Sequence, residues 1–179
     1  DAKERRFIAE YGLPEADAVI LVDDQEVAAY FEAVVSELGA KIDGGETKSE
    51  LNRMVKLAAN YFITEVRKYL ADEAKTIEQL PITPENYAEF VAIVADGKIN
   101  SSAAQTVLKE MLRGADGDTD PSHIIDRLNL AQMSDTGELE TIVDTILTNN
   151  AQSVADFKAG KQNAFQYLIG QVMSATKGK

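Results

Sequence analysis

The chain contains no cysteine among its 179 residues. This absence excludes disulfide bonds, zinc sites with thiolate ligands and cysteine nucleophiles. It agrees with the reducing cytoplasm, which is the location we expect for this chain. Proline is scarce, with four residues, and aromatic residues make up only 7% of the chain. Such a composition favours helices that pack through aliphatic side chains.

Long apolar runs and targeting signals are absent as well. No run is long enough to span a membrane, and the N-terminus lacks the basic-then-apolar pattern of a secretion signal. We therefore expect no membrane contact. The chain begins at Asp1 rather than at methionine, which indicates a fragment of a longer protein whose other activities lie upstream.

Basic residues are outnumbered, and the chain carries a net charge of -12. An acidic protein is a poor candidate for generic nucleic-acid binding, because phosphate contacts reward lysine and arginine. The charge is unevenly placed, however. Residues 151–179 contain four lysines and one aspartate, a net charge of +3, so the preceding residues carry -15. A basic end on an acidic body permits a local contact with nucleic acid.

The spacing of apolar residues predicts helices almost throughout and indicates no strand. One apolar stripe runs from Val27 to Leu38, with Gly39 expected to end its helix, and a second predicted helix extends from about Thr47 to Leu70. The polar residues 71–83 resemble a boundary between domains. We therefore predict an all-α chain in two parts, a helical connector over residues 1–80 and a small helical domain over residues 81–179.

Capping signals predict the helices of the second part. Thr83 followed by Pro84 is typical of a helix start, and Gly97 is typical of a helix end. Either Ser101 or Ser102 can cap the next helix. Further on, Asp135 has capping-box character and opens a helix predicted to bury its apolar residues, and the last helix is predicted to start near Gln162. The apolar residues of the helix after Asp135 are Leu139, Ile142, Val143, Ile146 and Leu147.

No catalytic residue and no metal site are predicted. The acidic loop 116–120 suggests calcium, but an EF-hand loop beginning at Asp116 needs glycine at its sixth position and glutamate at its twelfth. Those positions hold Pro121 and Arg127, so we predict a solvated loop that caps the next helix. His123 is the only histidine, and without a positioned partner it is interpreted as structural.

Two Gly–Lys steps precede helices, at Gly97-Lys98 and at Gly160-Lys161. Neither is a phosphate-binding P-loop, because the first glycine of that motif is missing and no serine or threonine follows the lysine. A lysine beside amide and hydroxyl side chains at a helix start nevertheless suits sugar-phosphate contact. The alternative is a glycine that ends one helix and an ordinary surface lysine. The sequence leaves both interpretations open.

Several longer segments resemble a known family. Residues 98–104, 130–135, 154–161, 165–173 and 176–179 are similar to the tail domain that GatB proteins share with the stand-alone YqeY proteins. Residues 5–7, 11–14, 30–32 and 59–62 resemble the helical region of GatB, which YqeY proteins lack. The resemblance therefore indicates the C-terminal portion of GatB, the B subunit of the aspartyl/glutamyl-tRNA(Asn/Gln) amidotransferases.

The resemblance implies a role in protein biosynthesis. GatB works with the A and C subunits in an ATP-dependent, glutamine-hydrolysing ligase that converts Glu-tRNA(Gln) or Asp-tRNA(Asn) to the amidated form. ATP and magnesium are implied for the catalytic cradle upstream, and no cofactor is implied for the present chain. The tail domain would contact the outer corner and D-loop region of tRNA.

The basic end and the two helix starts together predict the residues that contact the tRNA backbone. They are Lys98, Ser101, Ser102, Lys158, Lys161, Gln162, Asn163, Lys177 and Lys179. An alternative of another class is a helical interaction or scaffold module without RNA contact. That alternative predicts that the apolar stripes at residues 27–38 and 51–69 face a partner protein instead of an internal core.

Overall fold

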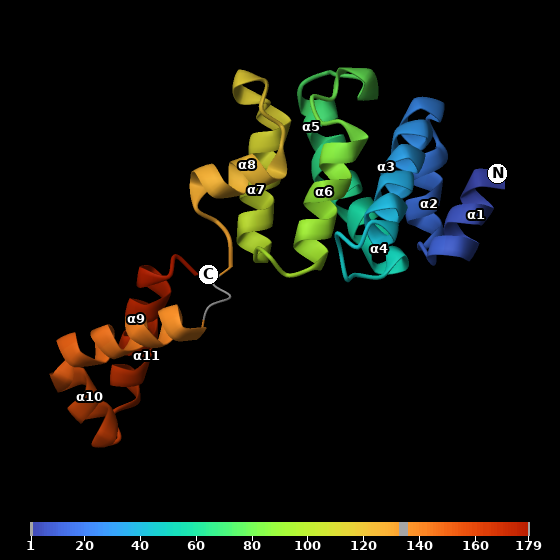
Figure 1. The fold of residues 1–179 in the computed structure, drawn as a ribbon. Helices are drawn as coiled ribbons and strands as arrows, with labels where there is room; N and C mark the ends of the chain where they lie inside the picture. Colours follow the sequence, from blue (N-terminus) through green and yellow to red (C-terminus); the bar gives the residue numbers. More distant parts are fainter. Residues whose placement is uncertain (1, 133–135, 179) are drawn as a thin grey trace. The chain divides into compact units, whose positions relative to one another are not determined.

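The computed structural model describes residues 2–132 and 136–178, and every regular element within them is helical (Figure 1). The predicted all-α fold is confirmed. The chain divides into two compact units, residues 1–130 and residues 131–179. No helix in the described residues is both long and apolar enough to cross a bilayer.

The first unit is built from eight α-helices and three short turns of other helix types within its described residues. Its α-helices are α1 (Ala2–Tyr11), α2 (Glu15–Val22), α3 (Gln25–Asp43), α4 (Leu51–Tyr61), α5 (Arg67–Asp72), α6 (Pro84–Ala95), α7 (Ser101–Arg113) and α8 (Pro121–Leu128). A π-helical turn, η1 (Phe62–Val66), joins α4 to α5, and 3₁₀ turns lie at η2 (Ile77–Gln79) and η3 (Ala115–Gly117).

The compact units separate at residue 130, not near residue 80 where the polar segment suggested a boundary. The reason is the position of α6, which packs against both α3 and α4 across the predicted boundary. A row of aromatic rings crosses it as well. Phe31 lies 6.2 Å from Phe62, and Phe62 lies 6.4 Å from Tyr87 of α6, measured between ring centroids. Residues 84–130 therefore complete the core of the first unit.

Within the described residues of the first unit, no buried side-chain nitrogen or oxygen atom lacks a hydrogen-bond partner. Tyr87 is fully buried, and its hydroxyl donates a hydrogen bond of 2.8 Å to the Ala58 carbonyl. The buried hydroxyl is therefore paired. The two predicted apolar stripes supply much of this core, including Phe31, Val34 and Leu38 from α3. The scaffold alternative expected these stripes to face a partner, and that expectation is wrong.

Local boundaries differ from the predictions at several points. Gly39 lies inside α3, which continues to Asp43, because the following residues Ala40, Lys41 and Ile42 sustain the helix. Thr47 does not begin α4, whose first residue is Leu51. Thr83 caps α6 through the Asn86 amide as predicted, and Gly97 follows the end of that helix with a positive φ of 72°.

The second unit contains α9 (Thr136–Asn149), α10 (Ala151–Lys158) and α11 (Gln162–Ala175), which pack on one another. The start of α11 at Gln162 is confirmed, whereas the predicted cap at Asp135 lies outside the described residues. Burial is sparse: among the described residues of this unit, only Leu168 and Thr176 are buried. The predicted burial is wrong for two of the α9 apolar residues, since Leu139 is 37% exposed and Leu147 is 38% exposed, whereas Ile142, Val143 and Ile146 are half-buried.

Candidate nucleic-acid interface

The turn between α10 and α11 holds most of the predicted contact residues of the second unit. Gly160 has a φ of 91°, which favours glycine. Its N–H donates to the Phe157 carbonyl at 2.9 Å, and the Lys161 N–H donates to the Asp156 carbonyl at 3.0 Å. These two bonds form a Schellman motif, in which glycine ends one helix and the next residue leads onward. Lys161 is thereby held at the entrance of α11.

The Lys161 side chain has a local partner. Its Nζ lies 3.0 Å from Asp156 Oδ1, and the side chains of the pair are 65% and 31% exposed respectively. The hydrogen bond from Lys161, with a second from Gln152, lowers the pKa of the Asp156 carboxyl. An exposed pair of this kind contributes little to stability. A phosphate group can therefore compete with Asp156 for Lys161.

The first turn of α11 is open to solvent. Lys161 occupies the N-cap position without a side-chain cap, and Gln162 and Asn163 are exposed in the turn that follows. Lys158, at the end of α10, is exposed as well. A helix N-terminus that lacks a capping side chain leaves N–H groups for an anion, and the helix dipole favours negative charge there.

Lys177 does not join this group. It is exposed and follows the opposite end of α11, with a φ of 53°. Because α11 has 14 residues, about 1.5 Å of rise per residue separates its two ends by roughly 20 Å. Lys177 and Lys161 therefore occupy separate positions on the second unit. Lys179 lies outside the described residues.

Lys98, Ser101 and Ser102 lie in the first unit, at the turn between α6 and α7. This turn repeats the Schellman pattern: the Gly97 N–H donates to the Val94 carbonyl at 3.1 Å and the Lys98 N–H to the Ile93 carbonyl at 3.1 Å. In both Gly–Lys steps the glycine is thus a helix stop, and the lysine after it is exposed.

The cap of α7 is Asn100, not Ser101 or Ser102. The Asn100 side-chain oxygen accepts from the Ala103 amide at 2.8 Å, and its backbone is extended. The serines consequently lie in the first turn of α7, where both are exposed. Their hydroxyls are displaced from the capping role and remain accessible from solvent.

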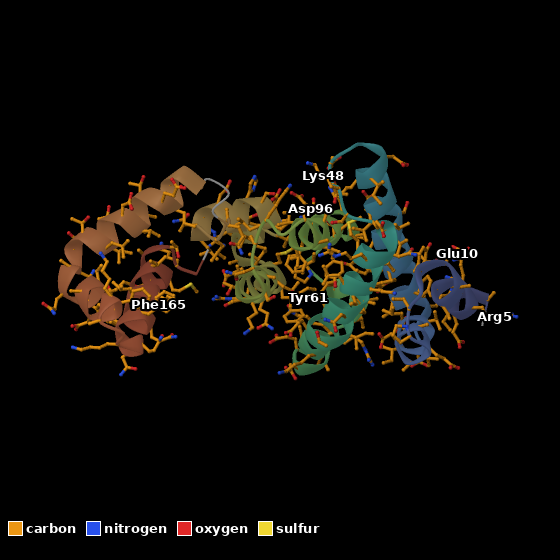
Figure 2. The ribbon with its side chains drawn as sticks, turned by 90° about the horizontal axis from the view of Figure 1, so that it is seen from below. Arg5, Glu10, Lys48, Tyr61, Asp96 and Phe165 are labelled. Atoms are coloured by element: carbon orange, nitrogen blue, oxygen red, sulfur yellow. The ribbon has the colours of Figure 1, made fainter. Side chains whose placement is uncertain are left out.

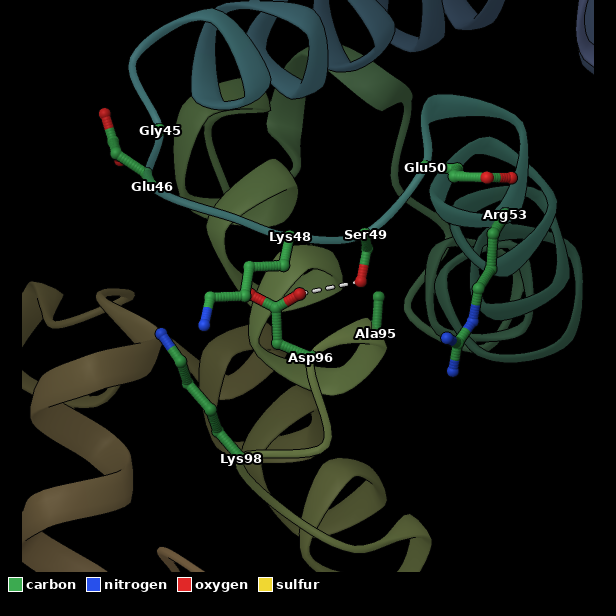
Figure 3. A pocket seen from close by; sticks show the side chains of 9 residues that line it. All are labelled: Gly45, Glu46, Lys48, Ser49, Glu50, Arg53, Ala95, Asp96 and Lys98. Carbon is green, nitrogen blue, oxygen red and sulfur yellow. Dashed lines mark hydrogen bonds between the residues drawn. The ribbon is translucent and has the colours of Figure 1, made fainter.

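An open cavity of about 700 Å³ lies beside Lys98 (Figure 3). Its lining comes from the loop after α3, the start of α4 and the end of α6, and consists of Gly45, Glu46, Lys48, Ser49, Glu50, Arg53, Ala95, Asp96 and Lys98. Sequence reasoning found only Lys98 among these residues. Residues 47–50 form a loop instead of the helix start predicted at Thr47, and this loop places Lys48 and Ser49 beside the end of α6. The Gly44-Gly45 pair indicates a turn, but not which segment that turn contacts.

Asp96 connects two of the segments that line this cavity. Its Oδ1 accepts hydrogen bonds from Thr47 Oγ1 at 2.8 Å and from Ser49 Oγ at 2.6 Å. Figure 2 shows Lys48 beside Asp96. Burial raises the pKa of the Asp96 carboxyl, but the bonds from Ser49 and Thr47 outweigh it, together with the Lys98 charge and the Lys48 backbone amide. The net result is a pKa below the ordinary value.

The acidic loop and the histidine behave as local structure. Asp120 accepts from the His123 amide at 3.1 Å and so caps α8, as predicted. The His123 side chain is 71% exposed, with its Nδ1 3.8 Å from Asp118. Across the described ranges, no group of three or more histidine or carboxylate side chains is arranged to hold a metal ion.

The second unit also carries an apolar groove of about 440 Å³. It is lined by Val143, Ile146, Leu147, Val154, Phe157, Lys158, Phe165, Leu168, Ile169, Val172 and Met173. Phe157 and Phe165 stack within it at a centroid distance of 5.1 Å, and Met173 is 53% exposed. Lys158 thus borders both the α10–α11 turn and this groove.

Comparisons with known proteins show which family the chain is similar to. The family model described as "GatB domain" matches residues 45–179. The B subunit of the aspartyl/glutamyl-tRNA(Asn/Gln) amidotransferase of Cupriavidus metallidurans is 41% identical over 178 residues, which cover 98% of this chain and 34% of the relative. The protein of the same name from Geobacillus thermodenitrificans is 38% identical over 179 residues, covering 100% of this chain and 34% of the relative. The chain spans about a third of the length of the curated relatives it matches.

Proposed function

Because the chain belongs to the GatB domain family, we propose that it is the tRNA-recognition part of the B subunit of a tRNA-dependent amidotransferase. The substrate class is the misacylated pair Glu-tRNA(Gln) and Asp-tRNA(Asn), as the names of the relatives suggest. The chain binds the tRNA backbone, so that the amino acid at the acylated end of the tRNA can be amidated elsewhere in the enzyme. The whole enzyme works in the cytoplasm together with its A and C subunits.

The α10–α11 turn is the observation that carries this proposal. It combines the exposed Lys158 and Lys161 with the exposed amide side chains of Gln162 and Asn163 at an open helix start. Lysine and amide groups bind phosphate and sugar without reading bases, so these residues would position the tRNA on the enzyme. Lys177 supports the same contact from the far end of α11.

The resemblance to GatB implies that ATP and magnesium act in the catalytic part of the enzyme. We propose that this chain contributes the binding and orientation of tRNA, and that the phosphorylation and transamidation steps take place in that other part of the enzyme.

A salt titration tests the proposal. The 179-residue chain is titrated with purified tRNA, beside the reversal variant Lys158→Glu/Lys161→Glu/Lys177→Glu and the single variant Lys161→Glu. We expect binding that weakens with salt, with a logarithmic slope reduced by about 0.7 to 0.9 for each phosphate contact removed. Unchanged affinity and unchanged salt dependence in Lys161→Glu would exclude Lys161 from the contact.

A matched control separates a local contact from bulk charge. The variant Arg67→Glu/Lys68→Glu/Lys109→Glu changes the net charge by the same amount at exposed positions of the first unit. It should bind tRNA like the parent chain if the second unit makes a specific contact. Equal losses in both triple variants would mean that tRNA senses only the total charge.

The apolar groove favours a second candidate, contact with the A or the C subunit of the amidotransferase. Exposed large apolar side chains gather on the second unit, Phe157, Phe165 and Met173 among them. Such a patch on a small helical unit is typical of an interaction surface. The variant Ile169→Gln/Met173→Gln should then weaken co-purification with those two subunits while tRNA affinity stays the same. The reverse result would favour the RNA contact alone.

A further inference from the structure

We propose that the cavity beside Lys98 is a second tRNA-backbone site, formed by Lys48, Arg53 and Lys98 of the first unit. We call it the basic notch. The inference rests on the proposed tRNA contact of the second unit and extends it to a surface where the sequence indicated only Lys98. Its ligand is the sugar-phosphate backbone of RNA.

The three cations of the basic notch come from separate parts of the chain. Lys48 lies in the loop after α3, Arg53 in the first turn of α4 and Lys98 in the turn after α6. All three are exposed. Figure 3 shows Lys48 and Lys98 on one side of Asp96 and Arg53 on the other. Within residues 2–132 and 136–178, none of the three forms an ion pair within 4 Å, although the Lys98 charge acts on Asp96 from a longer distance.

Three carboxylates also line the basic notch, those of Glu46, Glu50 and Asp96. Glu46 pairs with Lys41 at 3.1 Å. The Asp96 oxygen Oδ1 is occupied by the hydroxyls of Thr47 and Ser49. Glu50 and Glu46 point away from the two lysines (Figure 3). Asp96 remains ionised at neutral pH because its pKa is lowered, so the lysine side of the basic notch carries two cations beside one carboxylate.

The arrangement is held in place before any ligand arrives. The bonds from Thr47 and Ser49 to Asp96 fasten the loop that carries Lys48 to the end of α6. Lys98 is fixed on the same helix end by its backbone bond to Ile93. The backbone conformational entropy of these lysines is therefore lost during folding and not on binding, which favours binding.

The shape and chemistry of the basic notch favour a polymer backbone over a small molecule. Its volume of about 700 Å³ lies in the range of roughly 300–1,000 Å³ seen for ligand pockets, but such pockets are mostly apolar and enclose their ligand. Here the lining is charged and exposed. Positive groups on both sides of Asp96 can contact successive phosphates of a strand laid across the basic notch, as backbone-positioning contacts do.

A pair of matched variants tests the basic notch. The first is Lys48→Gln/Arg53→Gln/Lys98→Gln, and the control is Arg67→Gln/Lys68→Gln/Lys109→Gln, which also removes two lysine charges and one arginine charge from exposed positions. Glutamine keeps an aliphatic stem and leaves Asp96 and its hydroxyl partners in place. A third arm, Lys158→Gln/Lys161→Gln/Lys177→Gln, reports on the second unit. Each chain is titrated with purified tRNA over a series of salt concentrations, after circular dichroism has shown the parent helix content.

We expect the notch variant to bind about tenfold or more weakly at low salt and to lose about 2 from its logarithmic salt slope, while the control keeps both values. Parent-like binding by the notch variant, with loss only in the third arm, would overturn the basic notch and leave the proposed function standing. Equal weakening of the notch variant and the control would also overturn it. No binding by the parent chain at low salt would overturn both proposals.

Discussion

Asp96 offers the sharpest test of the structure, because a single carboxylate connects two segments far apart in sequence. Replacing it in Asp96→Ala removes the acceptor for Thr47 at 2.8 Å and for Ser49 at 2.6 Å. A hydrogen bond to a charged group contributes about 1.5–3 kcal/mol, and a site open to water falls at the low end because a freed hydroxyl can bind solvent. Thr47 is 8% exposed and cannot recover fully. We expect a loss of about 2 kcal/mol in the free energy of unfolding.

The pH dependence of this loss has a defined sign. The hydrogen bonds lower the pKa of Asp96 below its ordinary value of 3.8 in the folded chain. A carboxyl with a depressed folded-state pKa contributes stability that is fully present above the unfolded-state pKa and is lost as the pH falls through the folded-state pKa. The difference between the parent chain and Asp96→Ala should therefore shrink below about pH 4.

Urea unfolding followed by far-ultraviolet circular dichroism at neutral pH and at about pH 3 measures this difference. Asp43→Ala is the matched control, since Asp43 also ends a helix, is exposed and has no hydrogen-bond partner for its side chain in the part of the chain that the structure describes. A loss in Asp96→Ala no larger than in Asp43→Ala, or a loss that is the same at both pH values, would refute the reasoning.

Three further substitutions check the packing and the caps. Tyr87→Phe removes the hydroxyl that donates a 2.8 Å hydrogen bond to a buried carbonyl of α4. The free energy of unfolding in urea should fall by about 1–2 kcal/mol, and an unchanged unfolding midpoint would contradict that bond. Asn100→Ala should cost about 1 kcal/mol, whereas Ser101→Ala should be nearly neutral, and the reverse order would restore serine as the cap. Phe31→Ala in the buried core of the first unit should lower the free energy of unfolding by about 3–5 kcal/mol. Leu147→Ala, at a residue that is 38% exposed, should lower it by less than about 1.5 kcal/mol. Similar losses for the two substitutions would contradict the difference in burial between the two units.

Helix stops were predictable from the sequence because they depend on a single local requirement. Gly97 and Gly160 adopt a positive φ, which glycine reaches without steric cost. Thr83 before Pro84 was equally local, since a hydroxyl acceptor and a residue without an N–H suit the first turn of a helix. Gly39 shows the limit of the same rule. It lies inside α3, because a glycine permits a stop without requiring one and its neighbours continue the helix.

Some of the candidate contact residues were predictable from the sequence, and others were not. The lysines after the two helix stops are exposed as the sequence indicated, because charged side chains there have no apolar surface to cover. Lys48 and Arg53 were missed, because their neighbourhood depends on Thr47 and Ser49 bonding to Asp96. Those partners are 49 and 47 residues away in sequence. No pattern within a window of one helix reveals such a pairing.

The sequence by itself determined the helical class, several helix ends, the basic terminal stretch and the family resemblance, since each of these depends on residue identity within short segments. Only the tertiary structure decided that α6 to α8 join the first unit and that Lys48, Arg53 and Lys98 line one cavity beside Asp96. Burial and long-range hydrogen bonds are properties of pairs of segments, and the partner of a segment is chosen by packing over the whole chain.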